Sequence, residues 1–401
     1  NEAWDVILRM TERCASTARD KKEAKAAAQG DENAKNAELA QVRKDKKKLL
    51  NSDELVMLFT NCGGLDVTLS TAGADEMSDE QALDPNVMII QSLGNGRDQL
   101  STMGPKMISF LSMLEGEGAS SFGVVEAHLT AERGPAIAGH FLSHGYNTFI
   151  SLPKPDDPAA GIVYGSDPND FRRISEQVLF AGRLILITEE ILQIKLIWYV
   201  CLAYMQSAPG SDPKKIMRCK EVYSLLSDLL TSEDILISTV TILMDANARP
   251  RQATFHARNP NNTRKLAEKL LSEIEETWPE LALLNDPKKA THFQVLNKAR
   301  PPGTSGSQSE ATQTPPEELK FSKSVIDLAF VGPTILNLAS IRVISRVAPE
   351  IYHLNYHNTL RLALKVPKSN TGKRANPKLK FHNTLNKVQP LGQEQETVLM
   401  R

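Results

Sequence analysis

Cysteine is scarce in this 401-residue chain, which has only Cys14, Cys62, Cys201 and Cys219. Four cysteines this far apart exclude a disulfide framework and a CxxC zinc knuckle, because both need cysteines at short, regular spacings. Reduced thiols buried in the core are the simplest interpretation. They predict an intracellular protein in a reducing compartment.

Aromatic residues make up only 5% of the chain, whereas Ala, Leu, Ile, Glu and Lys recur throughout. This composition favours helix over sheet. The most apolar stretch runs over residues 184–205, but Glu189, Glu190 and Lys195 interrupt it. A membrane-spanning helix tolerates such charges poorly, so we expect a buried helix here and no membrane span.

The usual signatures of catalysis are also missing. The basic stretch around Gly372 and Lys373 resembles a phosphate-binding loop, but Pro367 stands where that loop needs glycine and Arg374 where it needs Ser or Thr. The chain has no G-x-S-x-G nucleophile motif. We therefore read this stretch as part of a basic tail.

Histidines occur in two pairs at i, i+4, His140 with His144 and His353 with His357. A zinc peptidase helix needs Glu directly after the first His, and neither pair has it. We interpret both pairs as packing or surface histidines, and expect no metal site, no cofactor and no enzymatic activity. Glu189 and Glu190 could be acid–base groups or could pair with Lys195 or Arg183, and the sequence leaves both interpretations open.

Charge is unevenly distributed along the chain. Residues 319–401 hold 13 Lys/Arg and 4 Asp/Glu, whereas residues 1–318 hold 34 and 44, and residues 351–393 contain no acid at all. A split of +9 against −10 predicts a polyanionic partner or pairing between copies of the chain.

The pattern of apolar residues predicts a mainly α fold of two helical lobes with a basic cleft between them and extended arms at both ends. Residues 1–50 are predicted as a polar helical arm, 51–247 as the N-terminal lobe, 248–366 as the C-terminal lobe with a flexible loop at 299–318, and 367–401 as a basic arm. Helices are expected over residues 52–59, 134–146, 167–205, 212–230, 232–246, 261–278, 321–330, 333–348 and 350–366.

Basic residues gather in segments with few neighbouring acids, which is typical of a groove that binds nucleic-acid phosphates without reading sequence. The predicted RNA-binding residues are Arg172, Arg173, Lys214, Lys215, Arg218, Arg249, Arg251, Arg258, Arg264, Lys265, Arg342, Arg346, Arg361 and Lys365. In the tail, a set of basic and apolar residues is predicted to contact a neighbouring subunit: Lys373, Arg374, Lys378, Lys380, Phe381 and Leu385.

This layout of a polar arm, two lobes, basic segments and a basic tail resembles the nucleoproteins of negative-strand RNA viruses, in particular those of non-segmented viruses. The resemblance implies a protein that coats single-stranded RNA and polymerises head-to-tail into a helical filament. It also implies a virion and host-cytoplasm location, and the viral polymerase or phosphoprotein as further partners.

Two other classes remain open. A helical viral capsid protein could use the basic tail to contact the genome. A helical enzyme could use Glu189 and Glu190, or one of the histidine pairs.

Overall fold

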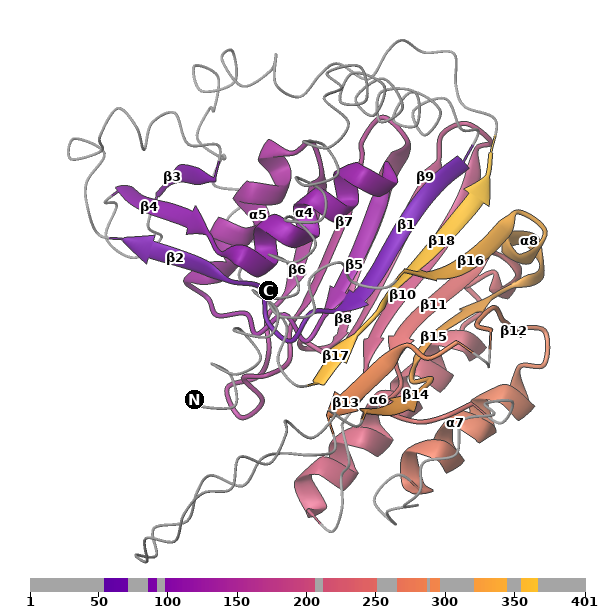
Figure 1. The fold of residues 1–401 in the computed structure, drawn as a ribbon. Coiled ribbons are helices and arrows are strands. Elements are labelled where there is room, and N and C mark those ends of the chain that lie inside the picture. The colour runs from indigo at the N-terminus through magenta and orange to yellow at the C-terminus, as the bar shows by residue number, and fades with distance from the viewer. Residues whose placement is uncertain are drawn as a thin grey trace, which may run out of the picture.

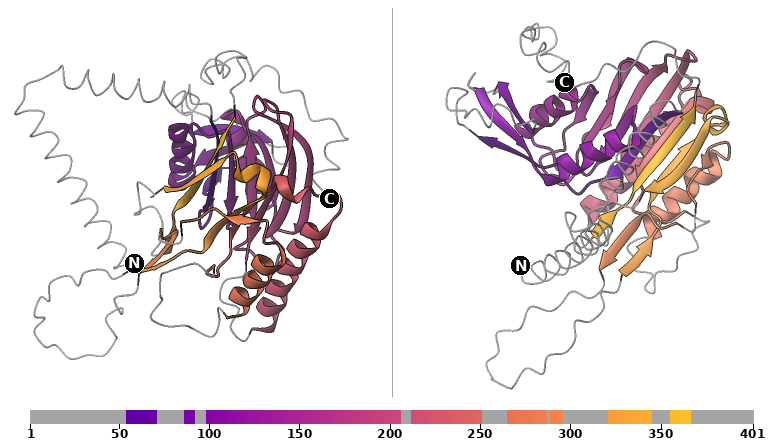
Figure 2. Two further views of the ribbon diagram at one scale, coloured as in Figure 1. Left: turned by 90° about the vertical axis from the view of Figure 1, so that its right-hand side faces the viewer. Right: turned by 45° about the horizontal axis from the view of Figure 1, so that its top comes forward.

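The computed structural model describes residues 54–70, 86–91, 98–205, 212–250, 265–286, 289–295, 321–344 and 355–366. Two six-stranded sheets pack face to face, and helices cover the outer face of each (Figures 1 and 2). The expected mainly α fold is therefore wrong, since the described chain is a layered α/β sandwich.

The first sheet has the strand order β16 (Ala339–Ile344), β18 (Thr359–Lys365), β1 (Glu54–Asn61), β5 (Ser121–Val125), β7 (Ile162–Ser166) and β6 (Asn147–Ser151). The second has the order β12 (Ala282–Leu283), β15 (Asp327–Val331), β11 (Val240–Asp245), β10 (Leu196–Tyr204), β9 (Leu184–Ile191) and β8 (Phe171–Phe180). Each sheet contains strands from both sides of residue 247, so the chain does not divide into two lobes there.

Two three-stranded sheets flank the sandwich. One contains β2 (Val67–Ser70), β4 (Asp98–Met103) and β3 (Val87–Gln91), and the other contains β14 (Phe321–Ser324), β13 (His292–Val295) and β17 (Asn355–His357). The helices are α4 (Pro105–Glu117), α5 (Arg133–Ser143), α6 (Pro213–Thr231), α7 (Lys265–Thr277), the short α8 (Pro333–Leu336) and the 3₁₀ turn η2 (Ile237–Thr239).

Both main sheets are buried on both faces. Leu55, Met57 and Phe59 of β1 point between the sheets, whereas Val56 and Leu58 face α4 and α5. On the second sheet, α6 and α7 pack on the outer face. Strands buried on two faces are continuously apolar and lack the alternation that marks a strand in sequence.

This double burial explains which predicted helices are wrong. Residues 184–205 form the hairpin of β9 and β10, and residues 52–59 lie largely in β1. Strands also occur in four further segments that were expected to be helical: 232–246, 321–330, 333–348 and 350–366.

The helices that are confirmed, α5, α6 and α7, are those with a polar face or a clear start signal. At the start of α6, Asp212 caps the helix and accepts a hydrogen bond from the backbone nitrogen of Lys214 at 2.9 Å. Among the residues that the structure describes, no helix is long and apolar enough to cross a membrane.

His140 of α5 gives a prediction about stability. Its side chain is buried, with Nε2 2.9 Å from Ser101 Oγ, and burial together with the charge of His144 lowers the pKa of His140 to about 4. Below pH 6.5 the unfolded chain binds a proton that the folded protein refuses, so stability falls as the pH falls towards 4. Between pH 7 and 5 the wild type should lose about 2 kcal/mol more than His140→Gln, measured by urea unfolding. Equal losses would exclude this role for His140.

Candidate active site

Four strands end at the same edge of the sandwich. In the first sheet β1 and β5 run parallel, with Asn61 paired to Val125, and Glu126 follows directly. In the second sheet β10 and β11 run parallel, with Tyr204 paired to Asp245. The carboxyl ends of parallel strands in a packed sandwich therefore bring polar residues from distant parts of the chain together.

Asn61 joins the two sheets at this edge. Its Nδ2 donates to Glu126 Oε2 at 2.6 Å and to Asp245 Oδ2 at 2.8 Å, while its Oδ1 accepts from the backbone nitrogen of Gly63 at 3.0 Å. Both protons of the amide are thereby directed at carboxylates. The amide fixes the spacing of two acids that would otherwise repel each other.

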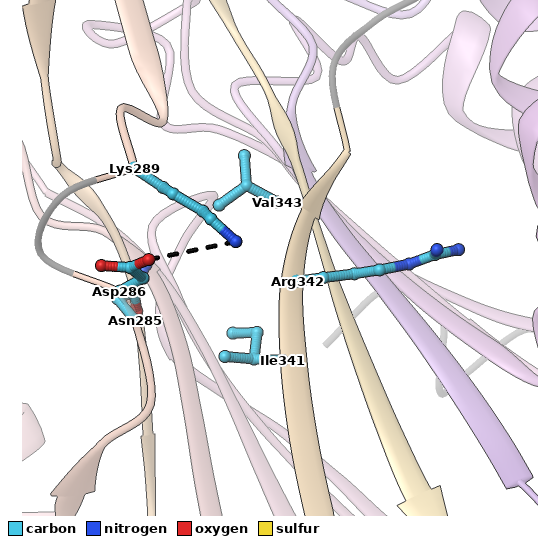
Figure 3. A pocket seen from close by; sticks show the side chains of 6 residues that line it. All are labelled: Asn285, Asp286, Lys289, Ile341, Arg342 and Val343. Atoms are coloured by element: carbon cyan, nitrogen blue, oxygen red, sulfur yellow. Dashed lines mark ion pairs between the residues drawn. The ribbon is translucent and has the colours of Figure 1, made fainter.

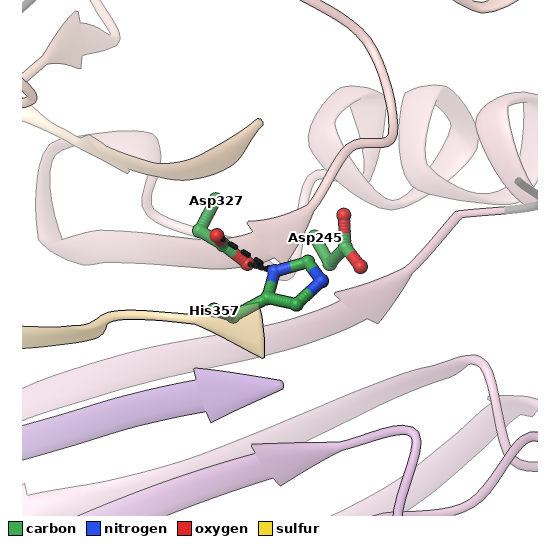
Figure 4. Close-up of side chains that lie close together, drawn as sticks. All are labelled: Asp245, Asp327 and His357. Atoms are coloured by element: carbon green, nitrogen blue, oxygen red, sulfur yellow. Dashed lines mark hydrogen bonds and ion pairs between the residues drawn. The ribbon is translucent and has the colours of Figure 1, made fainter. Parts of the chain in front are cut away.

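A histidine–aspartate pair completes the cluster. His357, at the end of β17, lies with Nδ1 2.9 Å from both carboxylate oxygens of Asp327, and Asp327 is paired to Asp245 across β15 and β11. Figure 4 shows the His357 ring between the two aspartates. Ligand atoms of Asp245, Asp327 and His357 lie within 4.8 Å of one another.

Backbone strain is concentrated here. Among the described residues, four non-glycine residues have positive φ, and two of them are Glu126 at 53° and Asn247 at 46°. A third is His128, whose Nε2 lies 3.5 Å from Glu126 Oε1. Such conformations persist where the surrounding structure imposes them, and they cluster at functional sites.

The electrostatics give these groups distinct protonation states. Burial opposes the charged ring of His357, but Asp327 and Asp245 outweigh it and raise the pKa of His357 to about 9. Burial raises the pKa of Asp245 to about 7, with His357 opposing the shift and Asp327 adding to it. Burial alone would also raise the pKa of Glu126, but hydrogen bonds with His128 and Asn61 lower it below its ordinary value. At neutral pH His357 is thus an imidazolium, Glu126 is ionised, and Asp245 is about half protonated.

Tyr204 adds a neutral donor. Burial and the charges of Glu126 and Asp245 raise the pKa of its phenol far above the ordinary value. Arg183 fixes this tyrosine: its guanidinium lies 4.6 Å from the ring centroid, and its NH1 donates to the backbone oxygen of Tyr204 at 3.1 Å. Two further hydrogen bonds, from Nε and NH2, tie Arg183 to buried Asp157.

The cluster fits a divalent cation of the magnesium class. Three acids, Glu126, Asp245 and Asp327, face one imidazolium, and burial is the main cause of the raised pKa of Asp245. A protonated His357 is no metal ligand. The carboxylates of Glu126 and Asp245 remain, and carboxylate oxygens are what Mg²⁺ or Mn²⁺ prefers. The sequence predicted no metal site, whereas the structure contains a cluster that is suited to one.

Five of the predicted basic residues form ion pairs within the chain. Arg172 pairs with Glu190 at 2.5 Å and Arg173 with buried Glu189 at 2.6 Å, so the partners of these glutamates are not the expected Lys195 or Arg183. Arg218 of α6 pairs with Asp156 at 3.0 Å and with Asp157 at 3.2 Å.

Strand β18 carries Arg361, which is buried and bonds Glu54 and Glu117, and Lys365, which is exposed. Arg342 on β16 also pairs with Glu117. Lys214 and Lys215 are exposed at the start of α6, Arg249 is half-buried just beyond β11, and Lys265 begins α7. The remaining predicted residues lie outside the described residues: Arg251, Arg258, Arg264, Arg346, Lys373, Arg374, Lys378, Lys380, Phe381 and Leu385.

Beside edge strand β16 there is an open hollow of about 20 Å³, lined by Asn285, Asp286, Lys289, Ile341, Arg342 and Val343. Figure 3 shows Ile341 and Val343 on the side of the hollow and Arg342 on the other side of the strand. Space for about one water is too little for a substrate. This hollow is therefore no candidate for a substrate site.

Sequence reasoning missed the site residues Asn61, Glu126, Tyr204, Asp245, Asn247, Asp327 and His357. A signal for three of them was present: Asn61, Glu126 and Asp245 each end or follow an apolar run that is too short for a helix. Had the runs been read as strands, these residues would have fallen at strand ends. His357 was interpreted as a packing or surface histidine, because no Glu follows the first histidine of its pair.

No known family model matches the sequence, and neither does any curated protein. Solved structures with a similar backbone include an AP endonuclease from Archaeoglobus fulgidus (TM-score 0.49, 12% identity, covering 78% of this chain and 100% of that one). Others are the AP endonuclease LMAP from Leishmania major (0.48, 11%, 78% and 88%) and the 3' phosphatase NExo from Neisseria bound to a product DNA hairpin (0.47, 12%, 77% and 99%). At such identities and TM-scores the likeness carries no argument about activity.

The viral nucleoprotein interpretation is wrong. It depended on two helical lobes, and the described chain has a two-sheet sandwich in their place. The expectation of a non-catalytic protein is wrong too, since buried acids and a histidine converge at one edge. Neither the described residues nor the solved structures named above support a filament, a viral polymerase or a phosphoprotein partner.

Proposed function

We propose that this protein is an enzyme that hydrolyses phosphodiester bonds of nucleic acid with the help of a divalent cation. The observation that carries the proposal is the Asn61 amide bridging Glu126 and Asp245 beside the Asp327–His357 pair. Mg²⁺ sites are typically built from one or two carboxylates plus the phosphate oxygens of the substrate. A site with two such carboxylates and an adjacent imidazolium suits a phosphate ester.

Glu126 and Asp245 would hold the cation, which neutralises charge on the phosphate when bound. A cation held by these carboxylates would also lower the pKa of a water bound to it and so supply the nucleophile. The His357 imidazolium, oriented by Asp327, places an N–H where negative charge develops on the phosphate. Tyr204 and the amides of Asn61 and Asn247 line the same edge as neutral groups.

The basic segment that leaves the site supports a polyanionic substrate. Arg249 follows Asp245 by four residues, and residues 246–267 contain no acid. Arg251, Arg258 and Arg264 continue this segment. Lys and Arg in such a segment bind nucleic-acid phosphates without base preference.

The test uses the purified chain with labelled single- and double-stranded DNA and RNA oligonucleotides, in MgCl₂, MnCl₂ or EDTA. We expect cleavage of at least one substrate with either cation and none in EDTA. His357→Gln should reduce the rate by about 10²–10³, since that is the usual cost of losing one donor aimed at developing negative charge. His144→Gln, on the outer helical layer, should leave the rate unchanged.

Failure to cleave all four substrates with both cations would refute the proposal. So would cleavage that persists in EDTA, or a His357→Gln variant as fast as the wild type. Cleavage of single-stranded RNA alone would identify RNA as the substrate.

A further inference from the structure

The small sheet β14-β13-β17 carries three polar residues in one rung. Across it, His292 of β13 is paired to Ser324 of β14 on one side and to His357 of β17 on the other. Directly opposed residues on neighbouring strands have their side chains on the same face of the sheet. The reactive imidazole is thus the last member of a row that starts at Ser324.

The side chains of this row are in contact. The ring centroids of His292 and His357 lie 4.6 Å apart with an interplanar angle of 56°, and His292 Nδ1 lies 3.1 Å from Ser324 Oγ. His292 is only 9% exposed. A buried ring held at one edge by a hydroxyl cannot rotate freely, so it presents a fixed surface to His357.

Thr291, the residue before His292, contacts the strand that carries Asp327. Thr291 Oγ1 accepts from the backbone nitrogens of Ile326 and Asp327 at 3.0 Å each. The backbone oxygen of Thr291 accepts from the nitrogen of Asn358 at 2.6 Å. One short segment therefore contacts both strands that supply the Asp327–His357 pair.

We propose that His292 is a positioning residue that holds the His357 imidazole in line with Asp327 and the phosphate. The inference rests on the proposed function, because it concerns the same site. The His292 ring packs against the His357 ring in a tilted arrangement, whereas Asp327 bonds Nδ1 of His357. Two contacts from different directions leave the ring one orientation. A reacting group displaced by about 1 Å can cost about 10² in rate.

Three variants of the full chain test this role. His292→Phe keeps a ring, His292→Leu removes the ring, and Ser324→Ala removes the hydroxyl that contacts Nδ1 of His292. Leu should lower kcat about 10- to 100-fold with KM unchanged within about twofold, because substrate contacts stay intact. Phe should recover most of the lost kcat. Ser324→Ala should fall between Phe and Leu.

The second readout needs no catalysis. The proton on His357 Nδ1 that bonds Asp327 gives a low-field resonance, assigned by its loss in His357→Gln and recorded without substrate or cation. We expect the resonance in the wild type and in His292→Phe, and its broadening or loss in His292→Leu.

The outcomes separate the two proposals. If the wild type cleaves nothing, the proposed function fails, and the resonance alone then decides the role of His292. If the wild type cleaves and His292→Leu keeps both its kcat and the resonance, only the positioning role fails. Should His292→Leu not fold by circular dichroism, Ser324→Ala carries the same test, since it removes a single oxygen. Unchanged kcat and resonance in Ser324→Ala would then overturn the role.

Discussion

Replacing Asp245 by Asn should abolish hydrolysis and at the same time stabilise the protein. The side chain is fully buried, and the pKa of Asp245 stands at about 7, against an ordinary value of 3.8. A raised carboxyl pKa means that the charged form destabilises the fold, fully so above pH 7 and no longer below about pH 4. Without a cation, Asn should therefore add roughly 2–4 kcal/mol to the free energy of unfolding at pH 8. The rate should fall about a hundredfold or more, because a neutral amide is a weaker ligand for the cation than a carboxylate.

Thermal unfolding in EDTA at pH 8 and pH 5, paired with a cleavage assay, tests both halves of this prediction. The melting temperature of Asp245→Asn should exceed that of the wild type at pH 8, and the difference should shrink at pH 5, where the wild-type acid is protonated. Added MgCl₂ should stabilise the wild type more than the variant, since a ligand that binds only the folded state raises its stability. Asp286→Asn, at an exposed carboxylate, is the control and should change neither quantity. A variant that is both active and no more stable would contradict the assignment.

The residues of this site were hard to find from the sequence. They are single polar positions in apolar strands, and no short motif contains two of the acids. Asn61, Glu126, Asp245 and His357 are separated by 65, 119 and 112 positions. Their meeting depends on sheet order, which a pattern of apolar residues does not specify.

The fold itself was partly predictable. Residues 212–230 and 261–278 carry a polar face at helical period, and both contain helices. Residues 184–205 show no period at all, because Leu186 and Cys201 pack under α6 while Ile187 and Trp198 pack between the sheets. For such runs length decides between strand and helix. The turn around Lys195, which has a φ of 51°, divides this run into two strands.

The charge argument missed the partners of several arginines for a related reason. It counted acids near each arginine in sequence, but 16 residues separate Arg173 from Glu189, and 62 separate Arg218 from Asp156. Pairs of this kind neutralise a basic residue without leaving a local signal. The segment after Asp245 enters the proposal above with its sequence-based interpretation.

Replacing Arg173 by Met should destabilise the protein by about 3–5 kcal/mol, which is a large share of the stability of most domains. Arg173 Nε bonds Glu189 Oε1 at 2.6 Å, its NH2 bonds Ser166 Oγ at 2.9 Å, and Glu189 is 0% exposed. Tyr164 OH also bonds Glu189 at 2.6 Å, but it is neutral. Removal of the arginine therefore leaves a carboxylate in the core with no cation, and the cost is that of an unpaired buried charge. Urea unfolding at pH 7 measures it.

Two variants separate this cause from a simple loss of packing. Arg172→Met removes the neighbouring ion pair to Glu190, but the Arg172 side chain is 67% exposed, so its loss should change stability by at most about 0.5 kcal/mol. Adding Glu189→Gln to Arg173→Met removes the orphaned charge, while the amide oxygen still accepts from one of the hydroxyls of Tyr164 and Ser166 and the amide NH2 can donate to the other. The double variant should recover most of the lost stability. If it is as unstable as Arg173→Met alone, the arginine acts through its packing and not through the charge of Glu189.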